Sequence, residues 1–297
     1  MPVIPAFVND AAGSASEAKR ALERAGGFEI NAVAPEEIEP RIRSAVESRP
    51  ERIVVAGGDG TIATAARAVC DSDTALAVMP GGTLNHFARD HGIPIDPAKA
   101  AEAALNGRVT RADTASVNER LFLNTSSVGA YVAYVRARDR VERWVGYRIA
   151  SLVAVIQILL FMRPVSLELE VDGKRRRYDT PLVFIGVGER ETRSPTFGNR
   201  VQGGINCLHV IVVRERRAAR LLVVALDAAT RGLEQIARTP EVDSFMTDSC
   251  VIRMRGKRHH ISLDGEIVAA SMPLEYRLAR NSLRIVIPAD SGSERGE

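Results

Sequence analysis

The first hundred residues alternate between short strand-like runs and amphipathic segments. The strand-like runs are Val3–Val8, Glu29–Val33, Ile53–Ala56 and Ala75–Met79. Between them, apolar residues recur at helical spacing, as Ile38, Ile42 and Val46 do. Strands that alternate with helices in this way predict a three-layer α/β domain with a parallel sheet, which we place at residues 1–114.

After residue 109 the pattern becomes strand-rich. Arg111–Val117 alternates polar and apolar residues, and Arg120–Val128 is the expected antiparallel partner strand across a tight connection at Asn118 and Glu119. Further short strands are expected at Val165–Val171, Lys174–Tyr178, Leu182–Gly186, Leu208–Val213, Cys250–Arg255 and Met272–Leu278, and helices at 130–162 and 217–236. We therefore predict a second, β-rich domain of antiparallel, sandwich-like architecture over residues 115–280. Residues 281–290 can return to the first domain, and residues 291–297 form a polar tail expected to be disordered.

The net charge and the positions of the cysteines limit the partners and the cellular compartment that we expect. The formal net charge of +3 is too small to indicate a nucleic-acid partner. Cys70, Cys207 and Cys250 are far apart and lack metal-ligand spacing, which favours a reduced, cytoplasmic protein. The most apolar segment, Ile149–Met162, is shorter than the roughly 20 residues that a membrane-spanning helix needs. We expect at most transient, peripheral contact with a membrane, and the sequence leaves a homodimer open.

A glycine turn follows the third strand-like run. Its sequence is Gly57-Gly58-Asp59-Gly60-Thr61, and an Ala-rich helix begins at its end. Glycines let a ligand approach the backbone amides, and the helix N-terminus offers unpaired N–H groups with a partial positive charge. Asp59 would repel a phosphate unless a cation or a substrate hydroxyl lies between them, so it points to Mg²⁺ or to proton abstraction. A plain turn capped by Asp59 explains the same glycine spacing.

A second glycine turn, Pro80-Gly81-Gly82-Thr83-Leu84-Asn85, follows the fourth run. Consecutive strands of a parallel sheet bring such turns to the same carboxyl edge, where α/β sheets bind ligands. Neither turn is a Walker loop, and neither has the spacing of a dinucleotide fingerprint. The pair therefore favours a phosphate-binding edge of another kind.

The two turns resemble those of the diacylglycerol kinase, sphingosine kinase and bacterial lipid kinase family, within its diacylglycerol kinase catalytic domain. The first turn alone is also shared with NAD kinases, whereas the pair at this spacing is specific. A third match is Leu263-Asp264-Gly265-Glu266, where the family carries an Asp-Gly-Glu. With Asn9 and Gly13 near the start, the resemblance spans nearly the whole chain.

The resemblance implies an ATP-dependent kinase of lipid metabolism and phospholipid biosynthesis. Its acceptor would be a hydroxyl of a lipid such as diacylglycerol or a sphingoid-like lipid, with Mg²⁺ as the metal. The nucleotide-binding residues would be Asn9, Gly57, Gly58, Gly60, Thr61, Gly81, Gly82, Thr83 and Asn85. Catalysis would involve Asp264, Asp59 and Glu266, with Asp113 contacting the substrate and Asp59 and Asp113 holding the catalytic metal. The family supports either Asp264 or Asp59 as the base, and our prediction favours Asp264.

Other readings of the same residues remain open. Asp264-Gly265 is a strong hairpin signal, because Ile261–Leu263 and Ile267–Ala269 flank it as strands would. A structural Mg²⁺ site known from some bacterial members is not expected, because Arg200–Asn206 contains no acidic residue. An NAD kinase-like phosphotransferase and a non-catalytic nucleotide-binding regulator are the alternative functions.

Overall fold

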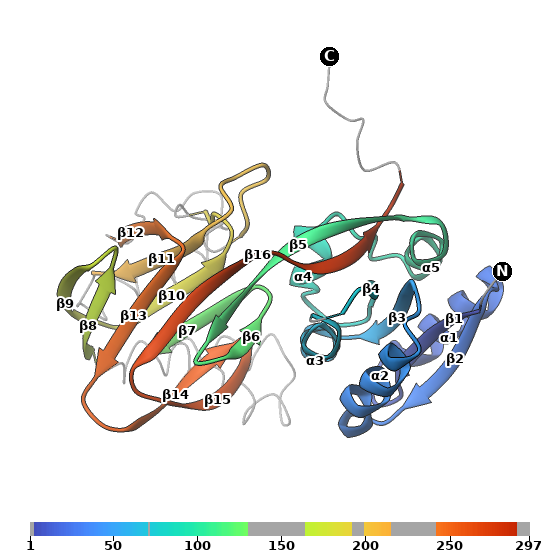
Figure 1. The fold of residues 1–297 in the computed structure, drawn as a ribbon, viewed down its shortest axis with the longest axis horizontal. Helices are drawn as coiled ribbons and strands as arrows, with labels where there is room; N and C mark the ends of the chain where they lie inside the picture. The colour runs from blue at the N-terminus through green and yellow to red at the C-terminus, as the bar shows by residue number, and fades with distance from the viewer. Residues whose placement is uncertain (1–2, 71, 130–163, 192–198, 215–241, 290–297) are drawn as a thin grey trace, which may run out of the picture. The chain divides into compact units, whose positions relative to one another are not determined.

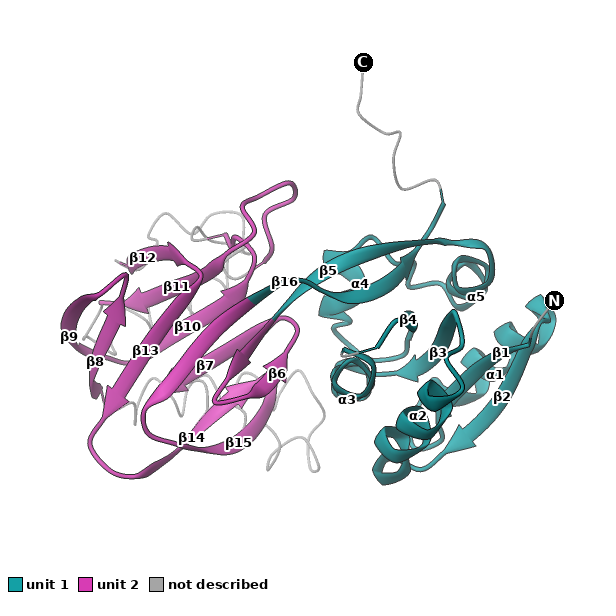
Figure 2. Cartoon of the chain, in the orientation of Figure 1, with its two compact units in different colours: residues 1–114, 279–297 teal, residues 115–278 magenta. Residues whose placement is uncertain are grey.

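The computed structural model describes residues 3–70, 72–129, 164–191, 199–214 and 242–289. The chain forms two compact units, one of residues 1–114 with 279–297 and the other of residues 115–278 (Figure 2). The helices expected at 130–162 and 217–236, the apolar segment 149–162 and the tail 291–297 lie outside the described residues.

The first unit is built on a parallel sheet (Figure 1). Its strands are β1 (Ile4–Asn9), β2 (Phe28–Val33), β3 (Arg52–Gly57), β4 (Ala75–Pro80) and the end of β16 (Leu274–Ile287). The strand order is β2-β1-β3-β4-β16, and each neighbouring pair is parallel. Ile285 of β16 lies beside Leu76 of β4. A strand from the C-terminal part of the sequence therefore joins the sheet that contains β1.

Helices cover the sheet of the first unit. They are α1 (Ala15–Ala25), the 3₁₀ turn η1 (Pro35–Glu37), α2 (Ile38–Glu47), α3 (Asp59–Val69), α4 (His86–Asp90) and α5 (Pro97–Asn106). α1 and α5 pack on each other and share one apolar cluster with the strands, whereas α2 packs on α3. Ile53, Val54 and Val55 of β3 are fully buried, as expected for a strand covered on both faces.

The second unit is an antiparallel sandwich. One layer contains β7 (Thr125–Gly129), β10 (Leu182–Val187), β11 (Leu208–Val213), β12 (Val242–Thr247), β14 (Arg258–Leu263) and β15 (Glu266–Ser271), in the order β12-β11-β10-β7-β14-β15. The other contains β8 (Val165–Val171), β9 (Lys174–Thr180), β13 (Ser249–Met254) and the start of β16. Residues of both layers, among them Leu169, Ile185 and Tyr276, form one core cluster. The predicted fold class, a parallel α/β region followed by an antiparallel β-rich region, is confirmed.

Two strands continue from one unit into the other. They are β16 and β5 (Arg108–Val117), which pair with each other (Figure 1). At the end of β5, Asn118 and Glu119 take positive φ angles of 45° and 69° and turn the chain into β6 (Arg120–Phe122). The predicted tight connection at these residues is therefore confirmed.

The strand prediction was wrong in two places. The single strand expected at 120–128 is two strands, β6 and β7, that belong to different sheets. The strand β12 was not predicted. Ser14 and Glu17 have the spacing of a capping box, yet the Ser14 side chain does not cap α1. Among the described residues, no helix is long and apolar enough to span a membrane.

Candidate functional site

Three connections meet at one edge of the first unit's sheet. β1 ends at Asn9, β3 at Gly57 and β4 at Pro80, and the three strands run parallel with Gly57 directly beside Pro80. Ligands of open α/β sheets bind outside the carboxyl ends of the strands. The ends of these strands and the segments that directly follow them contain all the predicted nucleotide-binding residues.

The two glycine turns touch through their backbones. The N–H of Gly81 donates a 2.8 Å hydrogen bond to the carbonyl of Gly57. A Cβ on Gly82 would lie 3.0 Å from the Cα of Gly58, and a Cβ on Gly57 would lie 2.6 Å from the side chain of Thr61. Contacts this close leave no room for a side chain at Gly57 and very little at Gly82, so packing within the protein explains these glycines.

The second turn is fixed by the side chain of Asn85. Its Oδ1 accepts the N–H of Gly82 at 2.8 Å, and its Nδ2 donates to the carbonyl of Gly82 at 2.8 Å. Asn85 has a left-handed backbone with φ of 50°, which asparagine tolerates better than most residues. The side chain is buried, so Asn85 shapes the turn. Thr83, in the same turn, is exposed.

The first strand is joined to the first glycine turn. Asn9 donates from Nδ2 to the hydroxyl of Thr61 at 2.8 Å, and its Oδ1 accepts the N–H of Ala11 at 3.1 Å. Asn9 thereby connects the end of β1 to the start of α3. Its predicted role at the nucleotide edge is compatible with this position.

The N-terminus of α3 faces the same edge. Asp59 and Gly60 are the first two residues of this helix and are half-buried, and Gly58 precedes them in an extended conformation. No side chain caps the helix, so its first N–H groups keep the donor capacity that a phosphate can use. The alternative in which Asp59 serves as the cap is not what the structure shows.

The sequence did not identify Ser14 as part of this edge. Its hydroxyl donates a 2.9 Å hydrogen bond to the carbonyl of Gly81 in the second glycine turn. The local signal, a serine three residues before Glu17, pointed to helix capping. Only the tertiary fold reveals the contact, because the two residues are separated by 67 positions.

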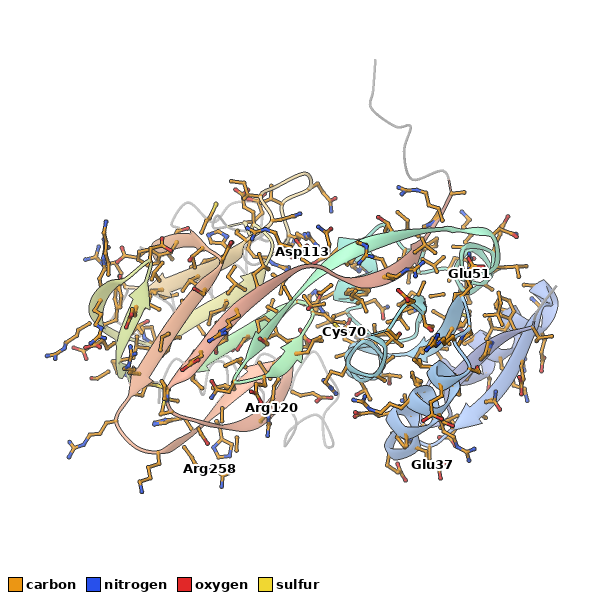
Figure 3. All side chains as sticks on the ribbon, viewed as in Figure 1. Glu37, Glu51, Cys70, Asp113, Arg120 and Arg258 are labelled. Atoms are coloured by element: carbon orange, nitrogen blue, oxygen red, sulfur yellow. The ribbon has the colours of Figure 1, made fainter. Side chains whose placement is uncertain are left out.

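Asp113 lies on β5 in the first unit (Figure 3). It is buried, and its Oδ1 accepts the N–H of Asn281 at 2.8 Å. Within the described parts of the chain, its buried Oδ2 has no hydrogen-bond partner. A buried carboxylate oxygen left unpaired costs free energy. A cation or a substrate hydroxyl is the kind of group that would satisfy it.

Asp264 and Glu266 lie in the second unit, on a two-residue hairpin between β14 and β15. Asp264 and Gly265 have φ angles of 47° and 88°, and Leu263 pairs with Glu266. The hairpin expected from Asp-Gly is confirmed. Glu266 is exposed.

The Asp264 carboxylate holds the corner between β6 and β7. Oδ2 accepts the N–H of Leu123 at 2.8 Å, and Oδ1 accepts the N–H groups of Asn124 and Thr125 at 2.8 and 3.1 Å. A carboxylate offers about four acceptor positions, and backbone groups occupy three of them here. These bonds fix the orientation of the Asp264 carboxylate.

No cluster of three or more His, Cys, Asp or Glu side chains that could hold a metal ion occurs in the part of the chain that the structure describes. Magnesium is commonly held by one or two carboxylates together with the phosphates of a nucleotide. The half-buried Asp59 at the glycine turns and the unpaired Oδ2 of Asp113 are donors of that kind. The residues present are therefore compatible with Mg²⁺ bound together with a nucleotide.

Comparisons with known proteins agree with the motifs. Residues 6–117 match the family model described as the diacylglycerol kinase catalytic domain. The diacylglycerol kinases of Staphylococcus aureus strains JH9 and Newman are each 30% identical to this chain over 173 residues, covering 56% of this chain and 54% of the relative. The chain thus spans about half the length of the curated relatives it matches. The resemblance to the diacylglycerol kinase catalytic domain is confirmed.

Solved structures agree with the fold over a longer stretch. A structure from Bacillus anthracis strain Sterne superimposes with a TM-score of 0.72 at 18% identity and covers 96% of both chains. A second structure from this strain, described as a diacylglycerol kinase, gives a TM-score of 0.67 at the same identity and coverage. At this identity the likeness establishes a shared fold and nothing further.

Proposed function

We propose that this protein is an ATP-dependent lipid kinase that phosphorylates a hydroxyl group of diacylglycerol or a sphingoid-like lipid. The observation that carries the proposal is the joining of three turns, after β1, β3 and β4, at one sheet edge through direct hydrogen bonds. The match of residues 6–117 to the diacylglycerol kinase catalytic domain supports the choice of lipid kinase. Access to such a substrate requires transient contact with a membrane surface.

The glycine turns would hold the nucleotide phosphates. Phosphoryl transfer needs positioning and charge stabilisation more than covalent chemistry from the protein. The backbone N–H groups of the glycine turns and the N-terminus of α3 supply hydrogen-bond donors and a partial positive charge. The hydrogen bond between Asn9 and Thr61 joins the end of β1 to the first turn of α3.

The acidic residues divide into an orienting and a metal-binding group in this proposal. Bound Mg²⁺ would neutralise charge on the phosphates, with Asp59 and Asp113 as its protein ligands. Asp264 would orient the acceptor hydroxyl and accept its proton, with Glu266 nearby on the same hairpin. The three backbone N–H bonds would hold the Asp264 carboxylate in a fixed orientation for this role.

Transfer of labelled γ-phosphate from ATP tests the proposal. The purified protein is incubated with Mg²⁺ and a panel of diacylglycerol, sphingoid base, monoacylglycerol, phosphatidylglycerol and NAD. We expect label in one of the first three lipids. Labelled NADP would instead support an NAD kinase-like enzyme. Nucleotide binding without any labelled product would support a regulator.

Two variants locate the chemistry once a labelled lipid is found. Asp59→Asn should reduce turnover and weaken the dependence of ATP affinity on Mg²⁺. Asp264→Asn should reduce turnover while ATP affinity stays near that of the wild type. The reverse pattern would exchange the roles that we propose for these two residues.

A further inference from the structure

Ser14 occupies an unusual place for a residue at the start of a helix. It stands at the N-cap position of α1, where a serine hydroxyl ordinarily accepts an N–H of the helix. Its hydroxyl instead donates to the carbonyl of Gly81, 2.9 Å away in the second glycine turn. The side chain therefore contributes to tertiary structure at the expense of local helix stability.

The contact also explains why position 81 is a glycine. A Cβ built on Gly81 would lie 2.0 Å from the Oγ of Ser14 and 3.2 Å from its Cβ. The next neighbour, the carbonyl oxygen of Gly57, would be 3.5 Å away, which is ordinary contact. Gly81 does not have a positive φ, so its backbone would accept alanine. The Ser14 side chain is thus the main obstacle to a side chain at position 81.

Ser14 completes a connected set of contacts around the sheet edge. Gly81 receives the Ser14 hydrogen bond on its carbonyl and donates its own N–H to Gly57 at 2.8 Å. The side chain of Thr61 packs over Gly57 and bonds Asn9 at 2.8 Å. Asn9 lies on the same connection between β1 and α1 that contains Ser14. Each of the three turns is therefore held by the other two.

We propose that Ser14 is a positioning residue of the nucleotide site, and that its bond to Gly81 fixes the second glycine turn against the connection between β1 and α1. The inference rests on the proposed function for its ligand. Sites that hold phosphates through backbone groups require placement to within a fraction of an ångström. Loss of the Ser14 hydroxyl should therefore weaken nucleotide binding, although Ser14 need not touch the nucleotide.

Four proteins test the coupling: the wild type, Ser14→Gly, Gly81→Ala and the double variant. The readout is the affinity for a non-hydrolysable ATP analogue with Mg²⁺, measured by calorimetry. Ser14→Gly should weaken binding about two- to tenfold, the range of one hydrogen bond. Gly81→Ala should weaken it more, and the double variant should bind better than Gly81→Ala because the clashing atoms have been removed. A double variant that binds as weakly as the two single losses combined would overturn the proposal.

A matched control and a second readout separate positioning from simple stability. Ser16→Ala, at an exposed site on α1, should leave the affinity unchanged. Thermal unfolding of the ligand-free proteins should show Ser14→Gly close to the wild type, while its KM for ATP rises and its KM for the lipid does not. A fall in unfolding temperature with unchanged ATP affinity would make Ser14 a structural tie only.

The same set of proteins distinguishes failure of this inference from failure of the proposed function. A wild type that binds no ATP analogue contradicts the nucleotide site itself and the role of Ser14 in it. A wild type that binds the analogue, together with a Ser14→Gly variant of equal affinity, contradicts the role of Ser14 alone.

Discussion

The side-chain amide of Asn9 donates a 2.8 Å hydrogen bond to the hydroxyl of Thr61, which lies 52 residues further along the chain. This bond connects the end of β1 to the first turn of α3 and joins two of the turns that form the proposed nucleotide site. Its partners are half-buried. Its contribution can be isolated because each partner can be replaced without introducing a new charge.

Asn9→Ala and Thr61→Val should each weaken ATP binding, because either change lets the two turns move apart. A neutral hydrogen bond contributes about 0.5–1.5 kcal/mol, so a loss of about two- to tenfold is expected for each. The double variant should be little worse than the worse single variant, since both remove the same interaction. Calorimetry on the four proteins measures the coupling. Strictly additive losses would show that the two residues act independently.

Gly82 and Gly58 should respond differently to alanine. A Cβ on Gly82 would lie 3.0 Å from the Cα of Gly58 and 3.1 Å from the Oδ1 of Asn85, whereas a Cβ on Gly58 meets its nearest atom at 3.6 Å. Gly82→Ala should lower the free energy of unfolding by about 1–3 kcal/mol, the usual cost of overpacking. Gly58→Ala should change it by less than half as much. Denaturant unfolding compares them, and equal losses would contradict the close approach of the turns.

Asp264→Asn should destabilise the second unit as well as affect turnover. The carboxylate accepts three backbone N–H groups at the β6–β7 corner, and an amide offers one oxygen in place of two. We expect a loss of about 2 kcal/mol in the free energy of unfolding, typical of hydrogen bonds to a charged group.

Glu266→Gln is the control for this change, because Glu266 is exposed on the same hairpin. It should leave stability unchanged. Chemical denaturation of both variants provides the comparison. An Asp264→Asn protein as stable as the wild type would mean that the three bonds contribute little to the free energy of unfolding.

His209 should make the second unit sensitive to mild acid. Burial lowers the pKa of His209 from its ordinary value of 6.5, and the Arg190 guanidinium lowers it further, while the Glu189 carboxylate acts in the opposite direction. Its Nδ1 accepts the N–H of Arg190 at 2.8 Å, so the neutral ring carries its proton on Nε2, which lies 2.6 Å from the Ser244 hydroxyl.

The sign of the effect follows from this lowered pKa. Below about pH 6.5 the imidazole of the unfolded chain takes up a proton while the folded one stays neutral, so stability falls with falling pH until the folded group titrates too. Unfolding midpoints between pH 5 and 8 should show this fall. It should be smaller in His209→Gln and retained in His260→Gln, an exposed control. A flat profile in the wild type would contradict the lowered pKa.

The sequence predicts the first unit more completely than the second. Its strands are short apolar runs, so the hydrophobic pattern alone finds β1, β3 and β4, and its helices have clear start and end signals. Asp96 illustrates this, since it precedes Pro97 and its side chain accepts the N–H of Lys99 at 2.9 Å, as a capping residue should.

The sequence-based predictions fail in segments whose local structure depends on contacts with residues far away in the sequence. The expected strand 120–128 is interrupted at Leu123 and Asn124 because Asp264, about 140 residues later, binds their N–H groups. β12 has little alternation and lies at a sheet edge, where its polar residues are tolerated. Ser14 carries a capping signal that the carbonyl of Gly81 overrides. Nothing within a short window of sequence contains this information.

The most direct test of the account is transfer of labelled γ-phosphate from ATP to diacylglycerol in mixed micelles, with Mg²⁺ and with a chelator in its place. We expect a labelled lipid product that requires Mg²⁺ and that decreases strongly in Asp59→Asn. Binding of ATP with no transfer to diacylglycerol or to any sphingoid or monoacyl lipid would contradict it.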